Sequence, residues 1–162
     1  MGGDAYKVNI YTFHAFCNDI IQANLSYFQK NTLQPVSEVE TQEIIRELID
    51  EMSSENILKR LTGDVYYDSS GLLSLFSTMK KEAWTSSVVE TSVNEYLRQI
   101  EESEEGEELY KLFKYQKDTK NGKKGDYKPA YNSEKERMDK LVAAAGLFNR
   151  FQELMASKNR YD

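Results

Sequence analysis

The sequence predicts a mainly α-helical fold, a helical, bundle-like subdomain with one short strand at its N-terminal end. Apolar residues recur at three-to-four spacing along most of the 162 residues, which is the period of an amphipathic helix. One short β-branched run near the N-terminus is strand-like, and no second alternating run that could build a sheet follows it. With 40% hydrophobic and 30% charged residues, the composition is that of a helix-rich, water-soluble chain.

The chain opens with a short strand that passes directly into a helix. Val8 and Ile10 belong to the strand, and Thr12 follows as a helix N-cap, because its hydroxyl oxygen can accept a hydrogen bond from a first-turn N–H group. The helix is expected to carry an apolar stripe at Phe13, Phe16, Cys17, Ile20, Ile21, Leu25 and Phe28.

Two more helices are expected before residue 62. Pro35 stops the first helix, and Ser37-Glu-Val-Glu40 is a capping box, in which the serine and the glutamate each bond to the other's backbone N–H. The helix that this box opens has an apolar stripe at Ile44, Ile45, Leu48, Ile49 and Met52. Ser54 is expected to cap a short helix that runs through Leu61.

Three helices are expected in the rest of the chain. Asp68-Ser-Ser-Gly71 starts a helix with Leu72, Leu73, Phe76, Met79 and Ala83 directed inward. Ser87-Val-Val-Glu90 caps the next, which carries Val93, Tyr96, Leu97 and Ile100, and Trp84 sits at the junction of the two. Ser133-Glu-Lys-Glu136 opens a long last helix through Met138, Leu141, Val142, Ala145, Phe148 and Met155. Residues 101–108 and 117–132 are expected to be loops.

The charge of the chain is unevenly distributed. Residues 1–110 carry 8 Lys/Arg against 20 Asp/Glu, a net −12, whereas residues 111–162 carry 13 against 7, a net +6. Between residues 110 and 128, lysines alternate with Tyr110, Tyr115 and Tyr127, a pattern that suits a nucleic-acid backbone and its bases. The alternative is that this Lys/Gly-rich loop is only a solvated surface that keeps a helical domain soluble.

The junction between strand and first helix is a second candidate for nucleic-acid contact. A strand-to-helix turn presents free backbone N–H groups, and these donors, the Thr12 hydroxyl and the positive end of the helix dipole suit a phosphate oxygen. An aromatic or imidazole side chain beside them, such as Phe13 or His14, can touch a sugar or a base. The alternatives are that Thr12 is an ordinary cap and Phe13 a core residue.

Three segments carry a resemblance to a known family. The stretch VNIYTFHAFCNDII, residues 8–21, resembles motif Ib of the UvrD/Rep/PcrA family of superfamily 1 DNA helicases, where a strand, Thr-Phe-His and a long helix follow each other. Phe148, Phe151, Gln152, Leu154 and the closing Tyr161-Asp162 resemble the helix and Tyr-Asp stretch that precede the family's motif II. Between them, residues 71–81 are similar to a helix with a Lys pair in the helical insertion called subdomain 1B.

The resemblance implies a fragment of a larger ATP-dependent DNA helicase. Residues 1–12 would be the end of the RecA-like domain 1A and residues 13–162 the 1B subdomain, an accessory module that helps to hold DNA. The parent would bind ATP and Mg²⁺, act as a hydrolase, and translocate on and unwind DNA in repair or recombination. Its partners would be single-stranded and forked DNA and the remaining helicase domains. The implied DNA-contacting residues are Thr12, Phe13, His14, Lys117, Lys120, Lys123, Lys124 and Lys128.

Catalytic and metal-binding motifs are missing from the sequence. No G-x-x-x-x-G-K-[ST] loop is present, since Gly122-Lys123-Lys124 lacks both the upstream glycine and the following Ser/Thr. Glu47-Leu-Ile-Asp50-Glu51 lies on an amphipathic helix rather than at the end of the buried strand that a magnesium-binding motif II needs. His14 and Cys17 lack further ligands at zinc-like spacing. The fragment alone is therefore expected to have no ATPase activity, no cofactor and no metal.

A cytoplasmic location without membrane contact is expected, because no apolar run approaches the length of a transmembrane helix and no signal peptide is recognisable. A single cysteine, Cys17, excludes an internal disulfide.

Two alternatives to the helicase interpretation stay open. One is a free-standing helical adaptor that binds protein partners through an apolar groove. The other is the same subdomain in a helicase-nuclease of the AddA/RecB type, which nothing in these residues distinguishes.

Overall fold

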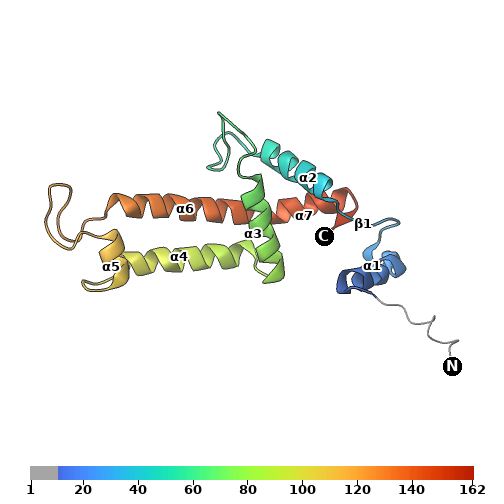
Figure 1. Ribbon diagram of the computed structural model, residues 1–162, viewed down its shortest axis with the longest axis horizontal. Coiled ribbons are helices and arrows are strands. Elements are labelled where there is room, and N and C mark those ends of the chain that lie inside the picture. The colour runs from blue at the N-terminus through green and yellow to red at the C-terminus, as the bar shows by residue number, and fades with distance from the viewer. Residues whose placement is uncertain (1–10) are drawn as a thin grey trace, which may run out of the picture. The chain divides into compact units, whose positions relative to one another are not determined.

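The computed structural model describes residues 11–162 and is mainly α-helical, which confirms the predicted fold class. The strand expected at Val8 and Ile10 lies outside the described residues. Figure 1 labels most of the elements, which are α1 (Phe13–Ala23), the 3₁₀ helix η2 (Leu25–Phe28), β1 (Gln34–Pro35), α2 (Glu38–Glu51), α3 (Ser69–Lys81), α4 (Ser86–Glu102), α5 (Glu108–Phe113), α6 (Pro129–Gly146), α7 (Phe148–Ser157) and β2 (Arg160–Tyr161).

The chain divides into two compact units. One unit holds the described residues up to Ile44 together with Gln152–Asp162, and the other holds Ile45–Phe151. The first unit therefore combines segments from both ends of the chain, with the second inserted between them. The domain boundary expected after residue 12 stays a prediction. Among the described residues, no helix is both long and apolar enough to cross a membrane.

In the first unit, α1 begins as predicted and ends earlier than predicted. The Thr12 hydroxyl accepts a hydrogen bond from the Ala15 N–H at 3.2 Å, which confirms the predicted N-cap. The helix stops at Ala23, because the Asn24 side chain donates to the Ile20 carbonyl at 2.7 Å and competes with the next helical turn. Leu25 and Phe28 consequently lie in η2 rather than in α1.

A small parallel pair of strands joins the two chain segments of this unit. Gln34 in β1 lies opposite Arg160 in β2, and Pro35 lies opposite Tyr161. The Val36 N–H donates to the Tyr161 carbonyl at 2.7 Å. Sequence alternation predicted no such pair, because two residues per strand are too few to form a recognisable period.

The capping box at the start of α2 is confirmed. The Glu40 carboxylate accepts from both the Ser37 N–H and the Ser37 hydroxyl at 2.9 Å, and the Glu40 N–H donates back to the Ser37 hydroxyl oxygen at 3.3 Å. The apolar stripe of this helix is buried throughout, as predicted, at Ile44, Ile45, Leu48, Ile49 and Met52.

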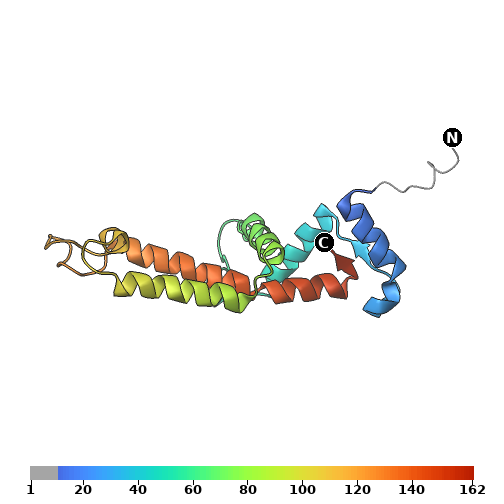
Figure 2. The same cartoon turned by 90° about the horizontal axis from the view of Figure 1, so that it is seen from below.

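In the second unit, α4 and α6 lie side by side, as both Figure 1 and Figure 2 show. At the end of this pair, Ile100 of α4, Phe113 of α5 and Tyr131 of α6 form a buried cluster. Elsewhere in the same unit, the Phe76 ring of α3 packs against Phe148 and Phe151, with centroid distances of 5.6 and 5.0 Å. The cluster of Ile100, Phe113 and Tyr131 positions α5 and the loop that follows it, residues 114–128.

Two predicted elements of the second unit are wrong. Residues 54–61 form turns instead of a helix, because the Asn56 side chain accepts from the Leu58 N–H at 2.9 Å and holds a local turn. The last long helix is two helices: α6 begins at Pro129, whose fixed φ suits a first helical position, and the break at Leu147 follows Gly146, a poor helix former.

The helix boundaries around Trp84 also differ from the prediction. The cap of α4 is Thr85, which accepts from the Val88 N–H at 3.3 Å, rather than Ser87. Ala83 is exposed and has a φ of 53°, so it terminates α3 instead of packing inward. At the start of α3, the Asp68 carboxylate makes no cap and instead pairs with Arg60 at 2.9 Å.

Candidate nucleic-acid interface

The first turn of α1 brings together the three predicted contact residues of the N-terminal junction. Thr12 caps the helix, and Phe13 and His14 form its first two positions. Helix geometry leaves the N–H groups of a first turn without an acceptor inside the helix, and the Thr12 hydroxyl satisfies that of Ala15. The remaining donors and the positive end of the dipole form a place where a phosphate oxygen is electrostatically favourable.

Aromatic side chains surround this turn and are open to solvent. Phe13 is 78% exposed, so it is not a core residue of the described chain, and its ring meets the His14 ring edge-on at 6.2 Å. Tyr11 and Phe16 form a second pair at 6.4 Å. A hydrogen bond to Asp19 raises the pKa of Tyr11. The exposed rings offer flat apolar faces of the kind on which bases stack.

The second candidate region is the basic loop, which we define as residues 114–128. This loop is folded by hydrogen bonds of its own. Short antiparallel bridges join Lys114 to Tyr127 and Thr119 to Gly122. The Asp126 carboxylate accepts from the Lys123 N–H at 2.8 Å, and the Asp118 carboxylate accepts from the Lys124 N–H at 2.9 Å. Because both acids bind backbone donors, the loop keeps its shape and its lysines project from a defined frame.

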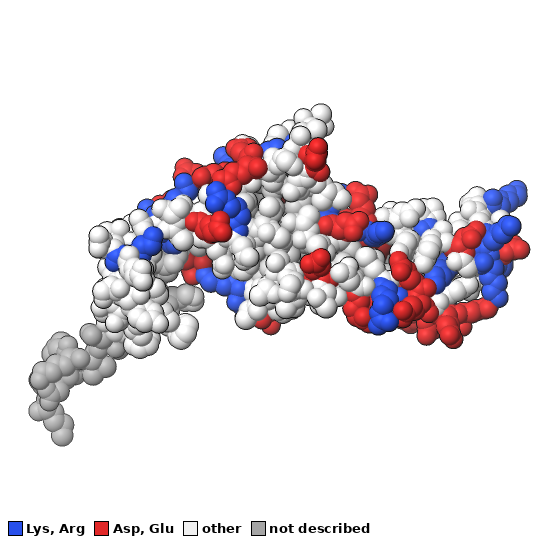
Figure 3. Space-filling view, turned by 180° about the vertical axis from the view of Figure 1, so that it is seen from behind, with Lys and Arg blue, Asp and Glu red and all other residues white. Residues whose placement is uncertain are grey.

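The five predicted loop lysines divide into two classes. Lys124 pairs with Glu105 at 2.5 Å, and the hydrogen bond to that carboxylate raises the pKa of Lys124. Lys128 donates to the Lys111 carbonyl at 2.5 Å. Lys117, Lys120 and Lys123 are exposed, and their ammonium groups have no partner among residues 11–162. At the right of Figure 3, cationic and acidic side chains gather at the end of the second unit that carries the basic loop.

Lys114 has a different role from the other lysines of the loop. It is only 8% exposed, and its ammonium donates to the Glu101 carbonyl at 2.7 Å and to the Ser103 carbonyl at 3.3 Å, at the end of α4. The rings of Tyr110 and Tyr127 lie 5.5 and 5.6 Å from the same ammonium. Lys114 therefore anchors the basic loop to α4.

The tyrosines between the lysines contact the frame of the loop, although Tyr127 stays 43% exposed. Tyr127 stacks on Tyr131 with a centroid distance of 4.1 Å. The Tyr131 hydroxyl donates to the Glu101 carboxylate at 2.8 Å, and burial together with this bond raises the pKa of Tyr131 to about 12. A side chain at Gly122 would meet the Tyr115 ring at 2.5 Å, so that ring covers the glycine. These rings support the frame of the loop.

The two candidate regions belong to different units. Thr12, Phe13 and His14 lie in the unit that ends at Ile44, and the five lysines lie in Ile45–Phe151. His14 and Cys17 do not form part of a metal site in the described chain, where no three His, Cys, Asp or Glu side chains come together. The chemistry offered is thus anion binding at a helix N-terminus and at three free ammonium groups.

Comparison with known proteins yields one family. The family described as the UvrD/REP helicase N-terminal domain matches residues 1–162, which is the whole chain. No curated protein and no solved structure matches it.

Proposed function

The chain belongs to the UvrD/REP helicase family, and on this premise we propose that it is an accessory DNA-contacting subdomain of an ATP-dependent DNA helicase. The observation that carries the proposal is the basic loop, in which three lysines without a partner among residues 11–162 project from a hydrogen-bonded frame. Phosphates are the anions that such a cluster of ammonium groups attracts in a helicase.

The proposed DNA contacts are of two kinds. Thr12, Phe13 and His14 would hold a single strand, since the first turn of α1 offers backbone donors and Phe13 an exposed ring. Lys117, Lys120 and Lys123 would neutralise backbone phosphates near a duplex junction. Lys124 and Lys128 would contribute less, because each ammonium already has a partner in the chain.

We further propose that the segment after residue 12 is the helical insertion called 1B. For Ile45–Phe151 this is supported by their inserted position between chain segments that fold together, whereas residues 13–44 group with Gln152–Asp162. The remaining RecA-like domains of the parent would then complete the helicase, and forked or single-stranded DNA would be its substrate, in the cytoplasm.

We propose that the chain itself binds neither ATP nor Mg²⁺. The sequence has no phosphate-binding G-x-x-x-x-G-K-[ST] loop, and residues 11–162 bring no three acidic, histidine or cysteine side chains together. The nucleotide chemistry of the parent would therefore reside in its other domains, and this chain would act by binding DNA.

Substitution of the free lysines tests the proposal. The double variant Lys120→Gln with Lys123→Gln removes two unpartnered charges and leaves the backbone bonds of the loop in place. We expect weaker binding to labelled forked DNA, with the slope of log K against log salt reduced by about 1 to 2. Fluorescence anisotropy across a salt series measures both quantities.

The matched control is Lys81→Gln with Lys135→Gln, which removes the same charge from exposed positions on α3 and α6. The control should bind as the unaltered chain does. Equal loss in the two double variants would mean that only net charge matters, and the assignment of the loop would then be abandoned.

A further inference from the structure

An acidic segment, residues 101–108, joins the end of α4 to the start of α5 and carries six glutamates. From residue 101 to the end of the basic loop at residue 128, the chain has seven lysines against eight Asp/Glu, a net charge of −1. The acidic segment therefore cancels the charge of the basic loop, and Figure 3 shows both kinds of side chain at this end of the second unit. Such a balance opposes the DNA binding that the loop is proposed to provide.

One ion pair joins the acidic segment to a lysine of the basic loop. The Glu105 carboxylate pairs with the Lys124 ammonium at 2.5 Å. Three other glutamates of the segment bind elsewhere: Glu101 accepts from the Tyr131 hydroxyl, Glu102 pairs with Arg98, and Glu107 accepts from the Glu104 N–H. Glu105 differs from these three because it holds one of the lysines that are predicted to contact DNA.

Glu105 is presented by a turn of defined shape. The Glu107 N–H donates to the Glu104 carbonyl at 3.2 Å, which closes a four-residue turn with Glu105 in its second position. Gly106 follows with a φ of 104°, a conformation that favours glycine. Lys124 is held in its turn by the hydrogen bond of its backbone N–H within the basic loop. Backbone bonds thus place both partners of the ion pair before DNA arrives.

The ion pair between Glu105 and Lys124 is nevertheless open to replacement. The Lys124 side chain is 49% exposed and that of Glu105 61%, and exposed pairs change an equilibrium constant by only up to about fivefold. A DNA phosphate can therefore displace the carboxylate from Lys124. The displaced Glu105 then takes up a cation from solution, so this exchange liberates about one counterion fewer than a phosphate contact with a free lysine does.

We propose that Glu105 is a built-in competitor of DNA, which occupies Lys124 in the free chain and is displaced when DNA binds. The inference rests on the proposed function, since it concerns what limits DNA binding by the same loop. Lys117, Lys120 and Lys123 make the first phosphate contacts, and Lys124 joins them after its carboxylate is released. Glu105 thereby lowers the affinity of the chain for DNA and makes that affinity depend less steeply on salt.

Glu105→Gln tests the proposal, because it removes the competing charge and keeps the size of the side chain. We expect the variant to bind labelled forked DNA about two- to fivefold more tightly at low salt. The slope of log K against log salt should become steeper by about 1, since Lys124 then acts as a free lysine. Fluorescence anisotropy of the 162-residue chain across a salt series measures both quantities.

Glu90→Gln is the matched control, because it removes the same charge from an exposed position of the same unit. Glu90 lies on α4 about 18 Å along the helix from Glu102, which exceeds the screening length of about 10 Å at 0.1 M salt. This variant should bind DNA as the unaltered chain does. Circular dichroism of each variant verifies the helical fold.

Lys124→Gln separates the ion pair from a general effect of charge. In the unaltered chain, a DNA contact of Lys124 must first break the pair, whereas in Glu105→Gln the lysine is free. Lys124→Gln should therefore weaken DNA binding about two- to fivefold more in the Glu105→Gln background than in the unaltered chain. The four chains form a double-mutant cycle that isolates this coupling.

Three results would overturn the inference, and they distinguish it from the proposed function. If the unaltered chain binds DNA and Glu105→Gln binds no more tightly than Glu90→Gln, Glu105 does not compete, and the proposed DNA contact still stands. If Lys124→Gln costs the same in both backgrounds, Glu105 does not act through Lys124. Absence of DNA binding by the unaltered chain and by Glu105→Gln alike would contradict the proposed function and this inference together, whereas binding by Glu105→Gln alone would support both.

Discussion

Glu40 is the residue whose ionisation is tied most closely to the fold. Hydrogen bonds from the Ser37 N–H, the Arg160 guanidinium and the Ser37 hydroxyl lower its pKa from 4.5 to about 2. Because the pKa is lower in the folded chain, ionised Glu40 stabilises the fold fully above about pH 4.5. That contribution is lost as the pH falls from about 4.5 to about 2.

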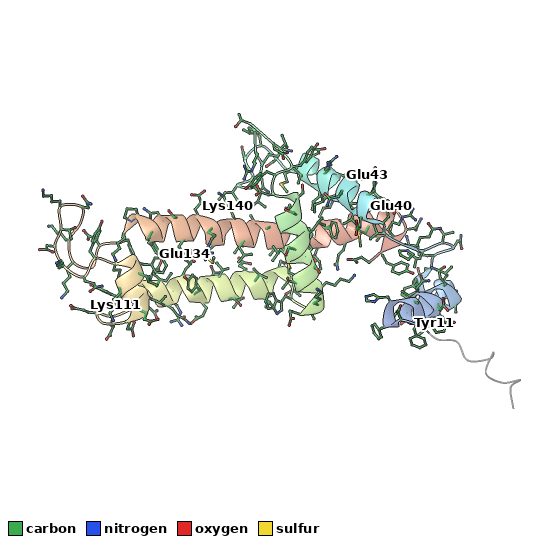
Figure 4. All side chains as sticks on the ribbon, viewed as in Figure 1. Tyr11, Glu40, Glu43, Lys111, Glu134 and Lys140 are labelled. Carbon is green, nitrogen blue, oxygen red and sulfur yellow. The ribbon has the colours of Figure 1, made fainter. Side chains whose placement is uncertain are left out.

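Glu40→Gln tests this linkage. Glutamine can keep the capping geometry and cannot carry the charge, so the variant should be less stable than the unaltered chain at pH 7. The difference should shrink as the pH falls below 4.5 toward 2. Urea unfolding at several pH values measures it. Glu43→Gln on the exposed side of the same helix is the control, and a pH-dependent difference of the same size there would refute the assignment (Figure 4).

Lys114 gives a second prediction for a single residue. Lys114→Met keeps the length of the side chain and leaves the Glu101 and Ser103 carbonyls without their donor, which should destabilise the fold by about 1 to 3 kcal/mol. Lys111→Met, at an exposed position on the adjoining helix α5, should change stability little (Figure 4). Denaturant midpoints compare the two, and equal midpoints would show that Lys114 does not anchor the loop.

The sequence predicts single residues well where their partners are near in the chain. The Thr12 cap and the box of Ser37 and Glu40 were predictable, because donor and acceptor lie three residues apart. The burial of Lys114 was not predictable, because its acceptors lie 13 and 11 residues away. Its neighbours in the sequence do not distinguish it from the exposed lysines of the loop. The same holds for Arg160, whose guanidinium reaches Glu40 across 120 residues.

Among the elements, the basic loop depends on the absence of a side chain at Gly122. A Cβ there would lie 2.5 Å from Cε2 and 2.7 Å from Cδ2 of Tyr115, so Gly122→Ala must displace the ring and should destabilise the loop by about 1 to 3 kcal/mol. In the background of Tyr115→Ala the same substitution should cost almost nothing. A double-mutant cycle by thermal unfolding measures this coupling, and additive effects would contradict it.

The helices show where apolar periodicity predicts the position of a helix correctly and where it does not. The stripe of α2 was predicted residue for residue, since five apolar side chains at helical spacing follow a strong cap. The helix expected at 54–61 was wrong, because the Asn56 side chain accepts a hydrogen bond from the Leu58 N–H and holds a turn where apolar spacing alone suggested a helix. The break between α6 and α7 was missed because the apolar stripe continues across Gly146.

At the scale of the whole molecule, the sequence predicted a mainly helical fold and a helicase family, and the structure and the family match confirm both. The sequence did not predict the division into two units. The parallel pair of β1 and β2 joins residues about 126 positions apart, and pairing of such distant, two-residue strands leaves no pattern in the sequence. The DNA-contacting residues stay predictions, because no local pattern in the sequence separates a solvated lysine from one that binds phosphate.

The most direct measurement is the salt dependence of DNA binding by the unaltered chain. Labelled single-stranded, duplex and forked DNA are titrated with the chain by fluorescence anisotropy over a salt series, with an ATPase assay in parallel. A DNA-contacting accessory subdomain should bind forked or single-stranded DNA best, lose affinity steeply as salt rises, and show no ATPase activity. Absence of binding at low salt and high protein concentration, or affinity indifferent to salt, would contradict the proposal.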